Sequence, residues 1–340
     1  MSHLNAFLES LITWAALTSG ELATTALLVF FIILSTLEVS APKEKLPSMG
    51  RRKSFQANIN LFVFNSAALS LLPVSSLLLL AEQYSGNGLL SYIANPVWAA
   101  VLSFLLLDLM HYFWHKASHS FDCLWMFHKV HHSDPYLNVS TAFRVHFIEL
   151  FIITALKAAY IILLGADKTT VLINETITTL FVMFHHSNIT FRGEKLLGRL
   201  IIVPCLHRVH HSTERREHDR NYGFVLSIWD RLFGTCAELE PAGIGIKNNV
   251  PQDLLNLLKL GFTSDPAPAA PVPEHVKPMI AEAAYYKAKC RDFSPGHELY
   301  DWLEAERDIL GVMYKDSLQR QPSRRQKLFN PKLILRSRYA

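Results

Sequence analysis

The chain has 340 residues, of which 50% are hydrophobic and only 18% charged, and its formal net charge is +4 at pH 7. Soluble domains carry about 25% charged residues, so the composition argues against a purely soluble globule and favours a membrane protein with polar segments. The four cysteines are far apart in the sequence and form no C-x2-C pair, which argues against a thiolate zinc site and a disulfide framework. No cleavable signal peptide is expected, because a basic start and a small-residue cleavage site are both missing.

Five apolar runs qualify as membrane spans, because about 20 residues cross the hydrocarbon core of a bilayer. The second run contains Pro73, which predicts a kink. The last two runs are short and close in sequence, which is compatible with a helical hairpin that does not fully cross the membrane. Lys157 lies inside the fourth run. We favour snorkelling of its ammonium group, or a helix that lies partly outside lipid, over a functional role. The runs cover residues 22–39, 59–81, 96–114, 147–164 and 169–184.

Lysine and arginine in the short loops predict the orientation of these spans. Five such residues follow the first run, between Lys43 and Lys53, whereas residues 82–95 contain none. The first loop is therefore expected in the cytoplasm and the second outside. This orientation brings the ends of the third and fifth runs to the cytoplasmic side and predicts a multi-pass protein.

The chain changes character towards its C-terminus. A Pro/Ala-rich stretch, residues 265–273, indicates a linker. The pattern that follows resembles a small bacterial helical domain of uncharacterised function. We predict N-terminal transmembrane helices (1–95), a histidine-rich domain (96–260), a linker (261–278), a helical accessory module (279–311) and a basic, disordered tail (312–340). Beyond this tail, nothing in the sequence supports nucleic-acid binding.

Three histidine clusters carry the chemistry: His115-Lys-Ala-Ser-His119, His128-Lys-Val-His131-His132 and His207-Arg-Val-His210-His211. On a helix, histidines spaced by three or four residues share one face. Scattered core or surface histidines account for single residues but not for a repeated H-x2-H-H pattern. One metal takes about three to six ligands, so eight imidazoles predict two metals.

Acidic residues near the clusters are expected to balance the charge of these metals. Soluble di-iron bundles use carboxylates in Glu-x-x-His motifs, and the clusters contain none. Asp108, Asp134 and Glu149 are candidates to accept a ring N–H from a ligating histidine. An ordinary capping or surface role is an equal alternative for each.

The clusters and their surroundings resemble the fatty acid hydroxylase/sterol desaturase superfamily of membrane di-iron enzymes. The resemblance runs from about Asp108 to Thr235. Besides the clusters it rests on four stretches: Thr141-Ala-Phe-Arg144-Val-His146-Phe-Ile-Glu149, His186-Ser-Asn188, Asp219-Arg-Asn221-Tyr-Gly223 and Trp229-Asp230-Arg-Leu-Phe-Gly234-Thr235.

The resemblance implies an all-α, integral membrane helical bundle with a cytoplasmic, histidine-rich di-metal region, in which residues 96–260 are the catalytic domain. It leaves ligation by His146 open. His111, one turn before His115, and His185 are further candidates, although His185 and His186 cannot point the same way from one helix. The resemblance implies nine metal ligands: His115, His119, His128, His131, His132, His186, His207, His210 and His211. It implies a catalytic role for all of them except His186.

The resemblance further implies two iron ions, O2 as co-substrate, and hydroxylation or desaturation of a membrane lipid or sterol-like substrate. The chain has no G-x-G-x-x-G motif after a strand and no cysteine cluster. We therefore expect a separate electron donor, either a ferredoxin or a cytochrome b5-like protein. Two other classes stay open: a membrane metal-handling protein and a non-catalytic, zinc-containing lipid-binding protein. Transport is disfavoured because the clusters lie at the ends of spans and not along a path.

Overall fold

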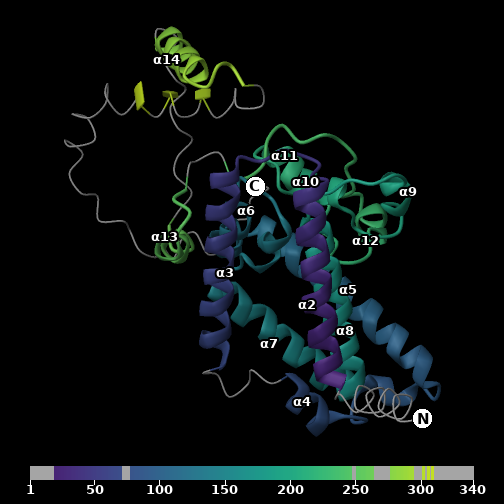
Figure 1. Cartoon of the computed structure of the whole chain (residues 1–340). Helices are drawn as coiled ribbons and strands as arrows, with labels where there is room; N and C mark the ends of the chain where they lie inside the picture. The colour runs from purple at the N-terminus through teal and green to yellow at the C-terminus, as the bar shows by residue number, and fades with distance from the viewer. Residues whose placement is uncertain are drawn as a thin grey trace, which may run out of the picture. The chain divides into compact units, whose positions relative to one another are not determined.

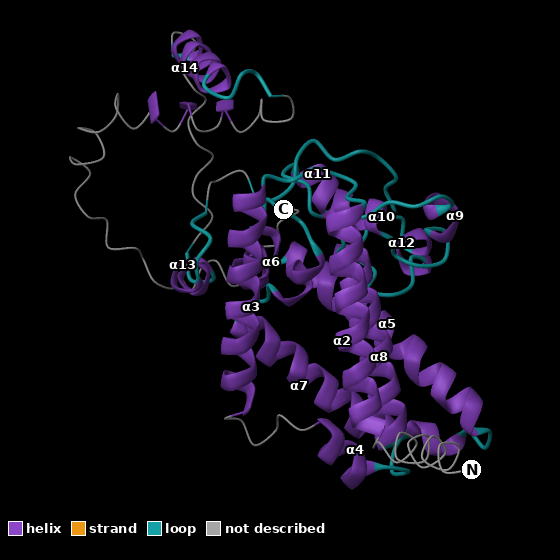
Figure 2. Ribbon diagram, viewed as in Figure 1, coloured by secondary structure: helices purple, strands orange, loops and turns teal. Residues whose placement is uncertain are grey.

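The computed structural model describes residues 19–70, 77–246, 250–263 and 276–294, together with 301, 302, 305, 306, 308 and 309. Within these residues every regular element is a helix, and β-pairing is limited to two isolated bridges (Figure 2). The chain divides into two compact units, one extending to Phe262 and one covering Thr263–Pro331. The predicted all-α class is therefore confirmed for the described part of the chain.

Long helices dominate the first unit (Figure 1). Helices α2, α5 and α8 run towards the end that carries the histidines, and α3 begins at that end. The short helix α4 (Leu77–Tyr84) packs against α7 and α8 at the opposite end. The long helices are α2 (Ser19–Ser40), α3 (Ser48–Ser70), α5 (Pro96–Ser120), α7 (Phe147–Leu164) and α8 (Lys168–His186).

Three of the described helices are long and apolar enough to cross a membrane: Gly20–Ser40, Pro96–Ser120 and Phe147–Leu164. They match the first, third and fourth predicted runs. The second run is divided between α3 and α4, and residues 71–76 between them, Pro73 included, lie outside the described residues. The fifth run lies in α8, where Lys168, Asn174 and Glu175 lower the hydropathy. The structure thus supports three of the five predicted spans.

Local sequence signals fix the ends of the helices around the site. Asn95 accepts hydrogen bonds from the backbone of Val97 and Trp98, and Pro96 opens α5. The hairpin between α7 and α8 turns at Gly165, which has a φ of 66° and ends α7 in the left-handed region. A Cβ at Gly165 would lie 2.3 Å from the backbone nitrogen of Gly88. Glycine is required there for both reasons.

Lys157 forms an ion pair that the sequence interpretation did not include. Its Nζ lies 2.7 Å from Oε2 of Glu175, so α7 and α8 are joined by an ion pair. Both side chains are partly buried. The apolar pattern of the fourth run alone did not reveal this carboxylate, because it lies on the neighbouring helix.

Short helices gather at the end of the bundle that carries the histidines (Figure 1). The loop between α2 and α3 contacts this end, because the amides of Lys43 and Glu44 donate to Asn188, just after α8, at 2.9 and 3.1 Å. The basic loop predicted to be cytoplasmic therefore lies beside the histidine-rich region. The short helices are α6 (Asp122–His132), η2 (Val139–Phe143), α9 (Glu194–Leu197), α10 (Pro204–His210), α11 (Arg215–His218), α12 (Ile228–Leu232) and α13 (Leu254–Leu260).

The second unit contains α14 (Lys277–Lys289). Val276, Ile280 and Ala305 form a small buried core, and Arg291 pairs with Asp301. Most of the predicted linker, residues 264–275, and the whole predicted tail, residues 312–340, lie outside the described residues. The predicted domain boundaries stay predictions.

Candidate metal centre

The nine histidines singled out as ligands come from four helices that meet at one end of the bundle. Helix α5 carries His115 and His119 on one face, one turn apart, and α8 ends at His186. Helix α6 contributes the second cluster and α10 the third, with His211 directly after its last residue. All nine side chains are buried, with at most 7% of their surface exposed.

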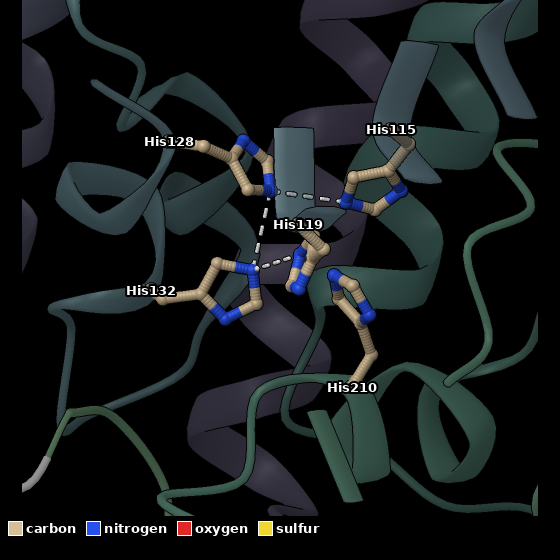
Figure 3. Close-up of side chains that lie close together, drawn as sticks. All are labelled: His115, His119, His128, His132 and His210. Carbon is tan, nitrogen blue, oxygen red and sulfur yellow. Dashed lines mark hydrogen bonds between the residues drawn. The ribbon is translucent and has the colours of Figure 1, made fainter. Parts of the chain in front are cut away.

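The structure brings these nine residues together in two groups. In each group the candidate ligand atoms all lie within 4.8 Å of one another. Figure 3 shows the larger group, in which rings from α5, α6 and α10 turn their nitrogens towards a common centre. The five-histidine group is His115, His119, His128, His132 and His210, and the four-histidine group is His131, His186, His207 and His211.

Hydrogen bonds at the outer ring nitrogens fix the tautomers in the five-histidine group. Nδ1 of His115 lies 2.8 Å from the carbonyl oxygen of Tyr222, which can only accept, so this Nδ1 carries the proton. Nδ1 of His128 lies 2.7 Å from Oε1 of Glu149, a carboxyl whose pKa burial raises to about 7. Once ionised beside a bound cation, this carboxylate accepts the proton of Nδ1. A neutral imidazole has one proton, so Nε2 of both rings presents a lone pair. These two Nε2 atoms are 3.1 Å apart, and two lone pairs at this distance need a cation between them.

The four-histidine group repeats this arrangement. Nδ1 of His131 faces the carbonyl oxygen of Arg144 at 3.2 Å, and Nδ1 of His186 faces that of Val182 at 2.7 Å. Their Nε2 atoms, again both lone pairs, are 3.0 Å apart. Each group therefore fits a metal ion held by imidazole nitrogens.

Burial keeps these rings neutral and ready to coordinate. It lowers the pKa of His131 to about 3, with a further contribution from neighbouring His128. Burial and neighbouring histidines also hold the pKa of His132, His207 and His211 well below the ordinary value. Neutral imidazole is the form that binds metal.

Carboxylates meet the histidines at two places, of which the sequence indicated one. Glu149 accepts from His128, as considered above. Asp219 accepts from Nδ1 of His119 at 3.1 Å and was missed, although it lies in the stretch that carries the family resemblance. The other two candidates have structural roles. Asp108 accepts from the amides of Val225 and Leu226 and from Trp229, whereas Asp134 accepts from Ser54, Asn58 and Thr141.

Backbone carbonyls that orient the ligands were invisible in the sequence. The carbonyls of Tyr222 and Arg220 accept from His115 and His210, and both belong to the loop 219–223. Asp230 holds this loop by accepting from the amides of Tyr222 and Gly223, each at 2.8 Å. Burial raises the pKa of Asp230. The sequence did contain one indication of this arrangement. The Trp229–Thr235 stretch, which is part of the family resemblance, supplies the carboxylate of Asp230.

Three further histidine candidates lie outside both groups. His146 caps α7, accepting from the amide of Ile148 at 3.2 Å, and its Nε2 lies 3.1 Å from the carbonyl of Leu258. Both of its nitrogens are therefore engaged. His111 stacks on Phe224 with ring centroids 4.7 Å apart, and His185 packs against His207 at 4.0 Å. A third set that could hold a cation, His119 with His218 and Asp219, shares His119 with the five-histidine group.

Comparison with known proteins agrees with this geometry. Residues 100–235, which carry both groups, match the family model described as "Fatty acid hydroxylase". This region belongs to the fatty acid hydroxylase superfamily. Residues 277–311, in the second unit, match a family described as "Protein of unknown function (DUF2934)". No solved structure matches the chain.

Individual relatives of this fatty acid hydroxylase region act on different lipids by name. The region is 34% identical over 146 residues to alkylglycerol monooxygenase of Danio rerio, covering 42% of this chain and 31% of that protein. It is 36% identical over 166 residues to an ornithine lipid hydroxylase of Rhizobium tropici, covering 48% and 50%. A fatty acid hydroxylase of Lecanicillium sp is 31% identical over 198 residues, covering 51% and 53%. The chain thus spans about half or less of the length of these relatives.

Proposed function

We propose that this protein is a membrane-bound di-iron hydroxylase that inserts one atom of O2 into a C–H bond of a lipid. The observation that carries the proposal is the pair of buried histidine groups with facing lone pairs, within the region that matches the fatty acid hydroxylase family. The relatives support a lipid substrate, since their names specify an alkylglycerol, an ornithine lipid and a fatty acid.

We propose that the nine grouped histidines hold two irons, one in each group. Bound iron supplies the O2-activating redox chemistry that side chains lack. The protein itself orients the ligands: Glu149, Asp219 and the carbonyls of Tyr222, Arg144 and Val182 fix which nitrogen faces inward. Burial excludes water from the site.

The proposed reaction converts a C–H bond to C–OH. One oxygen atom enters the substrate and the other leaves as water, which consumes two electrons and two protons. We assign the electrons to a separate donor, a ferredoxin or a cytochrome b5-like protein. Desaturation, in which the lipid loses two hydrogens instead of gaining oxygen, uses the same site and is the close variant of this proposal.

We further propose a multi-pass protein whose histidine-rich end faces the cytoplasm. Two observations support this orientation. The basic loop between α2 and α3 contacts that end through Lys43, Glu44 and Asn188. The segment 82–95, which contains no lysine or arginine, lies at the opposite end near α4 (Figure 1).

A non-catalytic zinc protein is the second candidate, and one observation favours it. The four-histidine group offers four nitrogen ligands, the coordination number of structural zinc. The five-histidine group exceeds that number, so zinc explains one group better than the other.

Isotope labelling tests the proposed reaction. Membranes containing the protein, supplied with a reduced donor and 18O2, are expected to yield lipids that carry one 18O atom in a new hydroxyl group. The matched control is His210→Ala, which should yield none. Unlabelled lipids from a protein that retains two irons per chain would contradict the proposal.

A further inference from the structure

Large apolar side chains are exposed over α9 and α12, beside the upper part of α5 (Figure 1). Leu196 in α9 and Leu200 just after it are 67% and 62% exposed, and Leu232 at the end of α12 is 70% exposed. Phe113 of α5 and Phe233 are exposed as well. These five side chains form the α9–α12 surface. Contiguous exposed apolar surface of this kind marks an interaction site with a protein or a membrane.

Direct contacts join the parts of this surface. The carbonyl oxygen of Gly198, at the end of α9, accepts from Oγ of Ser227 at 2.8 Å and from Nη2 of Arg231 at 3.1 Å. These bonds fasten α9 to α12. At the end of α12, the ring of Phe233 packs on that of Phe113, with centroids 5.3 Å apart. The surface therefore extends without interruption from α9 across α12 to α5.

The α9–α12 surface continues an exposed apolar stripe on α5, one of the helices long and apolar enough to cross a membrane. Leu102 and Leu106 are exposed on α5, and their helical spacing to Phe113 places all three on one face. Phe113 is the last exposed residue of this helix. The α9–α12 surface thus begins where the stripe that faces lipid ends.

The exposed charges around α9 are all positive. Arg192, Lys195 and Arg199 are exposed. The acidic residue among them, Glu194, is only 6% exposed and accepts from the backbone amide of Cys205 at 2.7 Å. Leucines and basic residues side by side are typical of segments that lie on a membrane containing anionic lipids.

Two carboxylates border this surface, in a hollow beside Gly198. Glu238 pairs with Arg231 at 2.7 Å, and Glu240 pairs with Lys43 at 3.3 Å. The bases around α9 outnumber these acids, so the surroundings of the surface carry net positive charge. Such charge repels a second copy of the same surface and attracts anionic lipid headgroups. A membrane therefore fits this surface better than a symmetric dimer does.

We propose that α9 and α12 lie in the headgroup region of the membrane, with Leu196, Leu200 and Leu232 among the acyl chains. The bases around α9 then contact anionic headgroups. This proposal rests on the membrane-bound part of the proposed function and not on hydroxylation. It places Phe113 at the membrane boundary, and His119, six residues further, lies about 9 Å beyond that level along α5.

Photocrosslinking of the full-length protein tests this proposal. The protein is placed in nanodiscs of equal amounts of phosphatidylcholine and phosphatidylglycerol, and p-benzoylphenylalanine replaces one residue at a time: Leu200 or Leu232 as test positions, Leu106 as the reference within the span, and Arg216, exposed on α11, as the control outside lipid. Mass spectrometry identifies the adducts after illumination. Both test positions should form lipid adducts as Leu106 does, and about tenfold more often than Arg216, because burial of a leucine-sized side chain favours lipid over water by about that factor.

The headgroups of the captured lipids test the role of the bases. Adducts at Leu200 should contain phosphatidylglycerol about fivefold more often than phosphatidylcholine, the effect of one basic residue near the membrane surface. Replacing both Arg192 and Arg199 by Gln should bring the two lipids close to equality. The matched control replaces Arg52 and Lys53, two exposed bases of α3, by Gln, and should keep the preference.

The outcomes separate this surface from the enzyme activity. Lipid adducts at Leu106 but at neither Leu200 nor Leu232 would overturn the proposal. Adducts that join two copies of the chain would overturn it in favour of a dimer contact, and equal capture of both lipids when all bases are present would contradict the contact with anionic headgroups. Lipid adducts at both test positions in a protein that oxidises nothing would refute the proposed hydroxylase and retain the membrane surface.

Discussion

Glu149 is the residue at which the proposed metal centre is most open to a quantitative test. Its Oε1 accepts from Nδ1 of His128 at 2.7 Å, and the side chain is buried. A hydrogen bond to a charged group contributes about 1.5–3 kcal/mol. Because about 1.4 kcal/mol is a factor of ten, Glu149→Ala should weaken metal binding roughly 10- to 100-fold, which is also the usual effect of losing such an outer partner. Glu149→Gln keeps an acceptor oxygen and should lose less.

Competition against a chelator of known affinity measures this effect in the purified protein. Glu240→Gln is a suitable control, because that carboxylate is 80% exposed and pairs only with Lys43 among the contacts described. We expect this control to bind metal as the wild type does. If Glu149→Ala binds metal within twofold of the wild type, His128 does not depend on Glu149, and the tautomer argument for the five-histidine group fails.

Three further predictions concern residues on and around the centre. His210→Ala and His131→Ala remove one ligand from different groups, so each should lower the metal content from about two to about one per chain and abolish turnover; a variant with wild-type activity would remove that residue from the ligand set. Asp134 forms a buried ion pair with Arg144, whose Nη1 lies 3.9 Å from Oδ2. Asp134→Asn breaks this pair and should lower the free energy of unfolding by about 3–5 kcal/mol, as measured by thermal unfolding; a change below about 0.5 kcal/mol would contradict this. Burial alone would raise the pKa of Asp134, but the buried guanidinium partner and three hydrogen bonds outweigh burial and leave this pKa lowered. The contribution of the ionised carboxylate to stability is therefore present above the ordinary pKa of 3.8 and is lost as pH falls below that value. The difference in stability between the wild type and Asp134→Asn should shrink at such acidic pH. Asp230→Ala releases the loop whose Tyr222 carbonyl orients a ligand and should weaken metal binding about tenfold; unchanged affinity in a chelator titration would show that the loop is held by other contacts.

The histidine spacing predicted most of the centre because spacing and helical geometry are directly connected. Residues such as His115 and His119, four apart, must share a face once α5 forms. His186 was found through the family resemblance, not through spacing. The division into five and four was not predictable, because His131 and His132 are adjacent in sequence and point into different groups.

The parts that the sequence did not reveal depend on tertiary packing. Backbone carbonyls such as that of Tyr222 have no sequence signature, and the partner of Lys157 lies on another helix. Asp108 was expected near a ligand because it shares the α5 face with His115. The oxygens of Asp108 instead accept hydrogen bonds from the backbone amides of Val225 and Leu226. Three of the five apolar runs predicted from hydropathy recur as long apolar helices among the described residues. The fifth lies in α8, whose Asn174 donates to Ser103 within the bundle.

Metal analysis of the purified protein distinguishes a di-iron centre from a zinc site. We expect about two irons per chain when the protein is expressed with sufficient iron, with one lost in a variant of either histidine group. About two zincs per chain, unchanged after expression in excess iron, would contradict the di-iron assignment and leave the facing histidines as a structural metal site.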